Sequence, residues 1–171
     1  MKKSDPVFLA FFTAFATSLY ILENLIPKPL PFIKLGLANV IVILLLWKNR
    51  HLPSFVVLVS KSIIGGLLTG LLFSPMTVIS LTAGVSSYII MQFGKRSRLG
   101  FSLLGISILG ATSHNLMQLA VVKFLLIKSE AVWRFLPLMI ILGVISGFIT
   151  GYLANLISHQ KIIDKYLNKE I

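Results

Sequence analysis

The chain has 171 residues, of which 56% are hydrophobic and 12% are charged, with a formal net charge of +11 and no cysteine. A soluble domain of this size and composition would expose large apolar patches, so the sequence predicts an integral membrane protein. The lack of cysteine in the sequence excludes a disulfide framework, a thiolate metal site and a cysteine nucleophile.

The first expected helix runs from about Pro6 to Leu25, with the proline at a first-turn position that tolerates it. Ala10 and Ala14 have the spacing of a small-residue packing face, and Glu23 points to the opposite side of the helix. One face can therefore pack closely against another helix, inside the bundle or in a partner. The opposite face brings a carboxylate near the outer surface.

A proline-rich segment, residues 27–31, predicts an extended connector between the first two helices. The second helix, from about Leu35 to Trp47, is too short to cross a bilayer, so its outer end needs a protein cover. Lys34 and Asn39 lie at this end. Lys34 can snorkel to the membrane interface, or it can line the mouth of a cavity together with Asn39.

A third helix is expected from about Ser54 to Phe73, with Lys61 one or two turns inside its cytoplasmic end. Lys61 can snorkel to that interface or complement negative charge on a ligand. Three glycines without side chains would let a neighbouring helix pack closely against this one, namely Gly65, Gly66 and Gly70. A fourth helix is expected from about Met76 to Phe93.

The fifth helix lies in an apolar run from Leu99 to Ile127, which is long enough to cross a bilayer but carries polar residues near its middle. At about 100° per residue these form one stripe, made of Ser107, Ala111, His114 and Gln118, with Asn115 beside it. Polar groups at this depth are costly in lipid and are expected to face protein or a water-filled cavity. The stripe is therefore the predicted ligand site, and hydrogen bonding between helices is the alternative role.

Lys123 lies close to the outer boundary and about 180° from His114, so it is expected to snorkel rather than bind. A loop of mixed charge, residues 128–134, carries Trp133 as an interfacial anchor. The sixth helix, from about Phe135 to Ser158, has a row of glycines typical of a packing face, Gly143, Gly147 and Gly151.

Most of the sixteen Lys and Arg residues fall in four clusters, Lys2/Lys3, Lys48/Arg50, Lys95/Arg96/Arg98 and Lys161/Lys165/Lys169. If each cluster marks the cytoplasmic side, both termini are cytoplasmic and the number of spans is even. The sequence thus predicts a single all-α domain over residues 1–171, a multi-pass bundle of about six transmembrane helices in a prokaryotic cell membrane, with a short cytoplasmic tail from about residue 159. The basic surplus then indicates orientation rather than nucleic-acid binding.

The acidic residues are too scattered to pair for magnesium binding or acid/base work, and they are Asp5, Glu23, Glu130, Asp164 and Glu170. The chain has no GxxxxGK[ST] phosphate loop and no HExxH motif, and its three histidines are expected at different depths. We therefore expect no enzymatic activity and no metal or other cofactor. Without a nucleotide motif the chain cannot power transport itself.

These motifs resemble the Gx transporter family, also called heptaprenyl diphosphate synthase component I, which is related to the S components of energy-coupling factor (ECF) importers. The matching motifs are Glu23 before the proline segment, residues 34–39, Lys61, residues 80–84 and residues 105–118. The resemblance implies about six helices and a ligand toward the outer side, under the loop between the first two. It also implies that Ala10 and Ala14, which match an AxxxA motif, dock on a transmembrane coupling subunit.

The combined expectation is a substrate-binding subunit that captures a small molecule between the first, second, fourth and fifth helices. The predicted binding residues are Glu23, Asn39, His114, Asn115 and Gln118 through hydrogen bonds, and Lys34 and Lys61 through charge. The implied partners are the coupling subunit, two ATPase subunits and the lipid bilayer. Two alternatives are a non-catalytic accessory protein in isoprenoid or quinone metabolism and a stand-alone secondary transporter.

Overall fold

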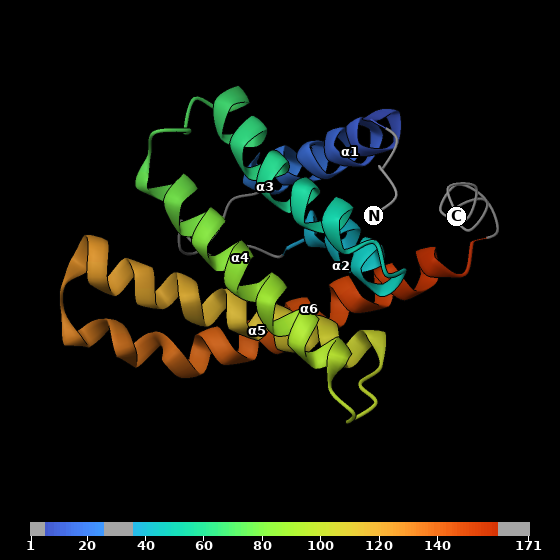
Figure 1. Cartoon of the computed structure of the whole chain (residues 1–171). Helices are drawn as coiled ribbons and strands as arrows, with labels where there is room; N and C mark the ends of the chain where they lie inside the picture. Colours follow the sequence, from blue (N-terminus) through green and yellow to red (C-terminus); the bar gives the residue numbers. More distant parts are fainter. Residues whose placement is uncertain (1–5, 26–35, 161–171) are drawn as a thin grey trace.

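A computed structural model describes residues 6–25 and 36–160, and these residues are mostly helical with no β-strand among them (Figure 1). The helices are α1 Pro6–Leu25, α2 Asn39–Trp47, α3 His51–Leu68, α4 Pro75–Arg96, α5 Leu103–Val121 and α6 Leu136–Ser158. A π-helical turn, η1 Val122–Ile127, and a 3₁₀ turn, η2 Glu130–Phe135, lie between α5 and α6. The predicted all-α class is therefore confirmed.

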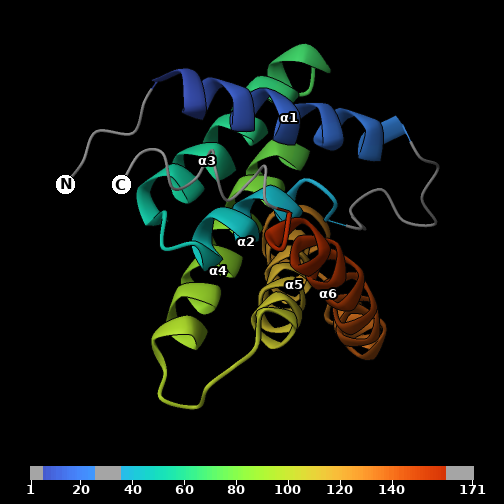
Figure 2. The ribbon, with the colours of Figure 1, turned by 90° about the vertical axis from the view of Figure 1, so that its right-hand side faces the viewer.

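The short helix α2 lies in the middle of the bundle, with α1 and α3 above it and α5 and α6 below it in Figure 2. All seven residues from Val40 to Leu46 are buried. A helix that is apolar all round is stable only when it is surrounded, and here other helices surround it. Asn39, the first residue of α2, is thereby held near the centre of the bundle.

The hairpin of α5 and α6 is the closest helix pair, and the two helices run side by side in Figure 1. A Cβ atom added at Gly143 would lie 2.7 Å from Cα of Thr112, and one at Gly147 would lie 2.6 Å from Cα of Ile108. Only glycine permits such a close backbone approach. The predicted packing role of this glycine row is confirmed.

Two helices are shorter than predicted because of glycines with positive φ. The second helix begins only at Asn39, since Gly36 has a φ of 79° and is followed by a turn. The third helix ends at Leu68, and Gly70 beyond it has a φ of 70°. Gly70 therefore lies in a turn outside α3, so its predicted packing role in the helix is wrong. Gly65 lies inside α3 and packs against α1, which confirms its predicted packing role.

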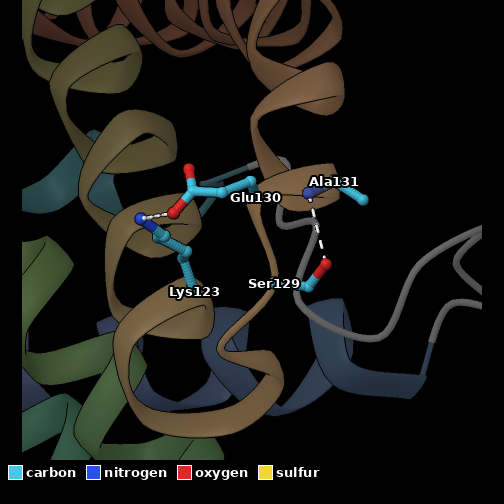
Figure 3. A network of polar contacts seen from close by, with 4 residues as sticks. All are labelled: Lys123, Ser129, Glu130 and Ala131. Atoms are coloured by element: carbon cyan, nitrogen blue, oxygen red, sulfur yellow. Dashed lines mark hydrogen bonds and ion pairs between the residues drawn. The ribbon is translucent and has the colours of Figure 1, made fainter.

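The segment between α5 and α6 was predicted as a loop, but residues 130–135 form the η2 turn. Lys123 lies on η1, and its Nζ is 2.7 Å from Oε1 of Glu130 (Figure 3). The side chain of Ser129 accepts a hydrogen bond from the N–H of Ala131 at 3.3 Å (Figure 3). This ion pair joins the two turns, and the snorkelling of Lys123 to the membrane interface stays a prediction.

Among the described residues, four segments are long and apolar enough to cross a membrane, namely Pro6–Glu23, His51–Leu68, Pro75–Arg96 and Glu130–Ser158. α2, with 9 residues, is too short to cross alone. α5 contains the polar stripe, which lowers its mean hydropathy. The structure is therefore compatible with a membrane protein, but the six predicted spans are not confirmed.

The basic clusters of the α2–α3 turn and of the α4 end lie next to each other. Nζ of Lys95 donates hydrogen bonds to the carbonyl oxygens of Leu46 at 2.5 Å and Trp47 at 2.8 Å, and to Oδ1 of Asn49 at 2.8 Å. The last carbonyl groups of a helix lack partners within that helix. Lys95 therefore joins the end of α2 to α4 and puts both clusters on one side of the bundle.

Candidate functional site

The first of two polar cavities, here called the charged cavity, is surrounded by α1, α2, α3, α4 and α5. It is lined by Tyr20, Glu23, Gly36, Ala38, Asn39, Lys61, Ser62, Ser80, Gly84 and His114. Glu23 is only 2% exposed and Lys61 only 5% exposed. A buried charge is costly unless hydrogen bonds or an opposite charge stabilise it. The surroundings of these two side chains therefore determine what the cavity can bind.

Gly36, in the turn before α2, and Asn39, the first residue of α2, each form a hydrogen bond with one of the charged side chains. The N–H of Gly36 donates to Oε1 of Glu23 at 2.6 Å, and Nζ of Lys61 donates to Oδ1 of Asn39 at 2.5 Å. The turn itself is closed by the N–H of Asn39, which donates to the carbonyl of Gly36 at 2.7 Å. Because the φ of Gly36 is 79°, a side chain at this position would be strained.

The second cavity, here called the hydroxyl cavity, lies beside the charged cavity among α2, α4, α5 and α6. It is lined by Gly36, Asn39, Ile43, Ser87, Met91, Ser107, Ala111, His114, Asn115, Ser146 and Thr150. Gly36, Asn39 and His114 line both cavities and so form their common boundary. The space open to the centre of a water molecule is about 20 Å³ in each cavity, which is room for one or two waters.

The polar stripe of α5 is buried, and part of it holds α5 against α6. Oγ of Ser107 lies 2.9 Å from Oγ1 of Thr150, and Nδ2 of Asn115 donates to the carbonyl of Met139 at 3.1 Å. Hydrogen bonding between helices, the alternative role given to this stripe, therefore describes both Ser107 and Asn115. His114 is 8% exposed and lines both cavities, so it is the member of the stripe that shares the charged cavity with Glu23 and Lys61.

Gln118 is a separate feature of the same helix. It is 1% exposed, and neither Nε2 nor Oε1 has a hydrogen-bond partner among the described residues. It lines neither the charged cavity nor the hydroxyl cavity. Each buried polar group left without a partner costs about 1–3 kcal/mol. We therefore expect the Gln118 amide to destabilise the folded protein.

We expect Gln118→Met to raise the melting temperature of the purified protein in detergent. Methionine fills a similar volume without a polar group, so the gain in stability is about 1–3 kcal/mol. Gln160→Met, at an exposed position after α6, is the matched control and should change stability by less than about 0.5 kcal/mol. A lower melting temperature for Gln118→Met would mean that the amide has a partner in the folded protein.

The structure brings together some of the predicted binding residues and separates others. Those that line the charged cavity are Glu23, Asn39, Lys61 and His114. Asn115 lines only the hydroxyl cavity, Gln118 lies outside both, and Lys34 lies outside the described residues. Ala10 and Ala14 are both on the exposed side of α1, away from the buried Glu23.

The snorkelling interpretation of Lys61 is wrong. Its ammonium group is buried and bonded to Asn39, a residue of the central helix. The depth of Lys61 along α3 could be read from the sequence, but its direction depends on where α2 lies. Since α2 packs between α3 and the α5–α6 hairpin, Lys61 points into the bundle.

Several lining residues were not predicted, namely Tyr20, Ser62, Ser87, Met91, Ser146 and Thr150. They show that α6 also contributes to the site, which was expected between the first, second, fourth and fifth helices with Lys61 added from the third. One signal could have indicated α6, because Ser146 and Thr150 are four residues apart beside the glycine row and so share a helix face.

The lining residues are mostly uncharged side chains that can form hydrogen bonds. Among residues 6–25 and 36–160, no group of three His, Asp or Glu side chains could hold a metal ion. Within the described part of the chain, Glu23 is the one carboxylate that lines the charged cavity, so these residues supply no acid/base pair of carboxylates. The cavities offer hydrogen-bond donors and acceptors and one buried charge of each sign.

Comparison with known proteins gave a family match. The family model described as heptaprenyl diphosphate synthase component I matches residues 12–157, a range that includes every residue lining the two cavities. Neither the curated proteins nor the solved structures gave a match to the chain.

Proposed function

This chain belongs to the heptaprenyl diphosphate synthase component I family, and we propose that it is a membrane-embedded binding subunit that captures a small polar molecule from the outer side. In this proposal it acts like the S component of an ECF importer. The molecule binds in the charged and hydroxyl cavities. Glu23, Asn39 and His114 contribute hydrogen bonds, and Lys61 contributes positive charge.

The observation that supports this proposal best is the burial of Lys61 and Glu23 around one polar cavity. Lys61 lies within a candidate membrane span, where an ionisable side chain is expensive and is by default a sign of function. Packing alone would be served better by apolar residues at both positions. The two charges and His114 therefore favour a ligand over a purely structural role.

We propose that the chain itself catalyses no prenyl transfer, although the family name refers to a synthase. Binding a diphosphate through magnesium requires several carboxylates, as this hard cation prefers oxygen ligands. The sequence has two aspartates, Asp5 and Asp164, and both lie outside the described residues. The cavities contribute Glu23 alone.

The exposed side of α1 is the proposed docking face for a transmembrane coupling subunit. Ala10, Ala14 and Ser18 are exposed there, and such a small-residue stripe lets a second helix approach closely. Two cytoplasmic ATPases bound to the coupling subunit would then supply the energy. Movement of the whole bundle in the membrane would release the ligand inside.

In the proposed membrane arrangement all six α-helices lie in the cell membrane, with both chain termini in the cytoplasm. The contact of Lys95 with the end of α2 supports this arrangement, because it places two basic clusters on one side of the bundle. Positive charge concentrates on the cytoplasmic side of membrane proteins. The short α2 is shielded from lipid by its neighbours.

The test is to purify the protein in mild detergent, denature it and identify by mass spectrometry any small molecule released in stoichiometric amount. We expect a defined compound from the wild type that is lost in His114→Ala, while the variant still folds. His159→Ala, at an exposed position after α6, is the matched control and should retain the compound. Retention by His114→Ala would assign His114 a structural role.

The family name favours one other function, an accessory role beside a prenyl diphosphate synthase. The proteins that copurify with the wild type distinguish the two functions. ATPases and a coupling subunit would support the importer, whereas a soluble synthase would support the accessory role.

A further inference from the structure

The turn that joins α5 and α6, residues 122–135, is here called the hairpin tip. Among the described residues its two parts, η1 and η2, pack mainly against each other and against α5 and α6. Figure 1 shows the tip at the far left end of the hairpin, at the opposite end of α5 from the end of α4. Most side chains of the tip therefore face the surroundings of the protein rather than another helix.

The surface of the tip is rich in large apolar side chains. Six of them are between 36% and 63% exposed, namely Phe124, Leu125, Leu126, Ile127, Trp133 and Phe135. Apolar groups gathered in this way indicate contact with an apolar partner or a membrane. The apolar segment Glu130–Ser158, which begins with η2, has 29 residues, whereas about 20 helical residues cross the hydrocarbon core. The segment is therefore long enough for η2 to reach the lipid headgroups while the rest crosses the membrane.

The tip also has an excess of positive charge. It contains three basic residues, Lys123, Lys128 and Arg134, and one carboxylate, that of Glu130, so its net charge is +2. Glu130 pairs with Lys123 at 2.7 Å (Figure 3). Lys128 and Arg134 are exposed, and neither side chain forms a hydrogen bond or an ion pair with the described part of the chain. These two charges can therefore meet an anionic partner.

Lys123 also holds the two parts of the tip together. Its Nζ lies 4.9 Å from the ring centroid of Phe124 on η1 and 5.4 Å from that of Trp133 on η2, and such cation–π contacts are attractive. The backbone N–H of Lys128 donates to the carbonyl of Lys123 at 2.9 Å. One folded element therefore presents both the apolar and the basic side chains.

We propose that the hairpin tip is a binding site for anionic phospholipids. Its apolar side chains lie among the upper parts of the acyl chains, and Lys128 and Arg134 bind the headgroup phosphates. A protein surface that combines large apolar side chains with Lys or Arg is typical of binding in the interfacial layer. Guanidinium matches phosphate with two parallel hydrogen bonds, and tryptophan is enriched in this layer. The inference uses no residue that lines either cavity, so it is independent of the proposed binding function.

The two exposed charges imply a measurable preference for anionic lipid. Each Lys or Arg near a membrane surface strengthens the attraction to anionic lipid about fivefold. Lys128 and Arg134 together should therefore favour an anionic lipid over a zwitterionic one about twenty-five-fold at the tip. The preference should weaken as the salt concentration rises, because exposed charges are screened.

The two tryptophans of the sequence, Trp47 and Trp133, make the tip accessible to a fluorescence measurement, because Trp47→Phe leaves only the one in the tip. The full-length variant is placed in bilayers of phosphatidylcholine and phosphatidylglycerol, and one of the two lipids carries bromine on its acyl chains. Bromine quenches a tryptophan that it touches. We expect quenching of Trp133 that is stronger with bromine near the headgroup than near the chain end, and about twenty-five-fold preference for phosphatidylglycerol.

Variants without the charges test which side chains bind the headgroup. Lys128→Asn suits the φ of 47° at this position, and Arg134→Gln keeps a polar side chain. Each should lower the preference about fivefold, and together they should abolish it without changing the melting temperature. The matched control combines Arg96→Gln and Arg98→Gln, which remove the same charge at and beyond the end of α4, and it should leave the Trp133 signal unchanged.

Three other results would overturn the inference. If iodide in the water quenches Trp133 and brominated lipid does not, the tip lies in water, and a protein partner would be the better occupant of its apolar surface. Equal quenching by the two brominated lipids would show that the tip does not select anionic headgroups. A preference that survives the double variant Lys128→Asn/Arg134→Gln would show that these two side chains do not bind them.

Discussion

Gly147→Ala is expected to destabilise the protein by about 3 kcal/mol, the upper part of the range for overpacking a close-packed interior. The added Cβ would lie 2.6 Å from Cα of Ile108 and 3.0 Å from the carbonyl oxygen of Ser107. These are backbone atoms of α5, which cannot rotate aside as a side chain can. The two helices must therefore separate, which also weakens the hydrogen bond between Ser107 and Thr150. The measurement is the melting temperature in detergent.

Gly84→Ala is the matched control, because it makes the same change inside a helix. A Cβ at Gly84 would lie 3.5 Å from Cδ1 of Leu58, which is an ordinary contact. Alanine also favours the helix over glycine by about 0.5–1 kcal/mol, so stability should stay the same or rise. Equal losses in the two variants would contradict the close approach of α5 and α6 at Gly147.

The first and last helices, α1 and α6, could be predicted from the sequence because particular residue types mark where they begin and end. The predicted first helix has the bounds of α1, where a proline opens a continuous apolar run. The last helix was predicted to within one residue at its start, and Ser158 ends it as expected. The packing face of α6 was also visible, since glycines four residues apart share one side of a helix.

The start of α2 and the end of α3 could not be predicted, because glycine has two different roles there. Gly65 lies inside α3 and allows α1 to approach, whereas Gly70 has a positive φ and follows the end of the helix. Gly36 likewise forms a turn where a helix was expected to begin. The sequence shows where a glycine is, but the surrounding structure determines whether it packs or turns.

The site was predicted only in part, because the sequence shows which face of a helix is buried but not what surrounds each side chain on that face. Periodicity identified the face of α5 that turns inward, and His114, Asn115 and Gln118 are all buried as a result. It could not show which partner each side chain meets, so three residues of one stripe have three different surroundings. The bond from Lys61 to Asn39 joins residues 22 apart in sequence on different helices, and no local pattern indicates it.

Lys95→Met is expected to destabilise the protein by about 2 kcal/mol, because hydrogen bonds from a charged donor are stronger than neutral ones. The variant leaves the carbonyl groups of Leu46 and Trp47 at the end of α2 without the ammonium group that they now share. It also removes a positive charge that offsets the negative end of the helix dipole. Since α2 carries Asn39 at its other end, the same variant should weaken ligand retention.

Arg96→Met is the control for this second variant. Arg96 is exposed in the same last turn of α4, so its loss removes a similar charge but no bond to α2, and the change should be below about 0.5 kcal/mol. Lys95→Arg should retain part of the stability, since guanidinium can also donate to carbonyl groups. If Lys95→Met and Arg96→Met melt at the same temperature, Lys95 does not anchor α2, and another contact must hold Asn39 beside Lys61.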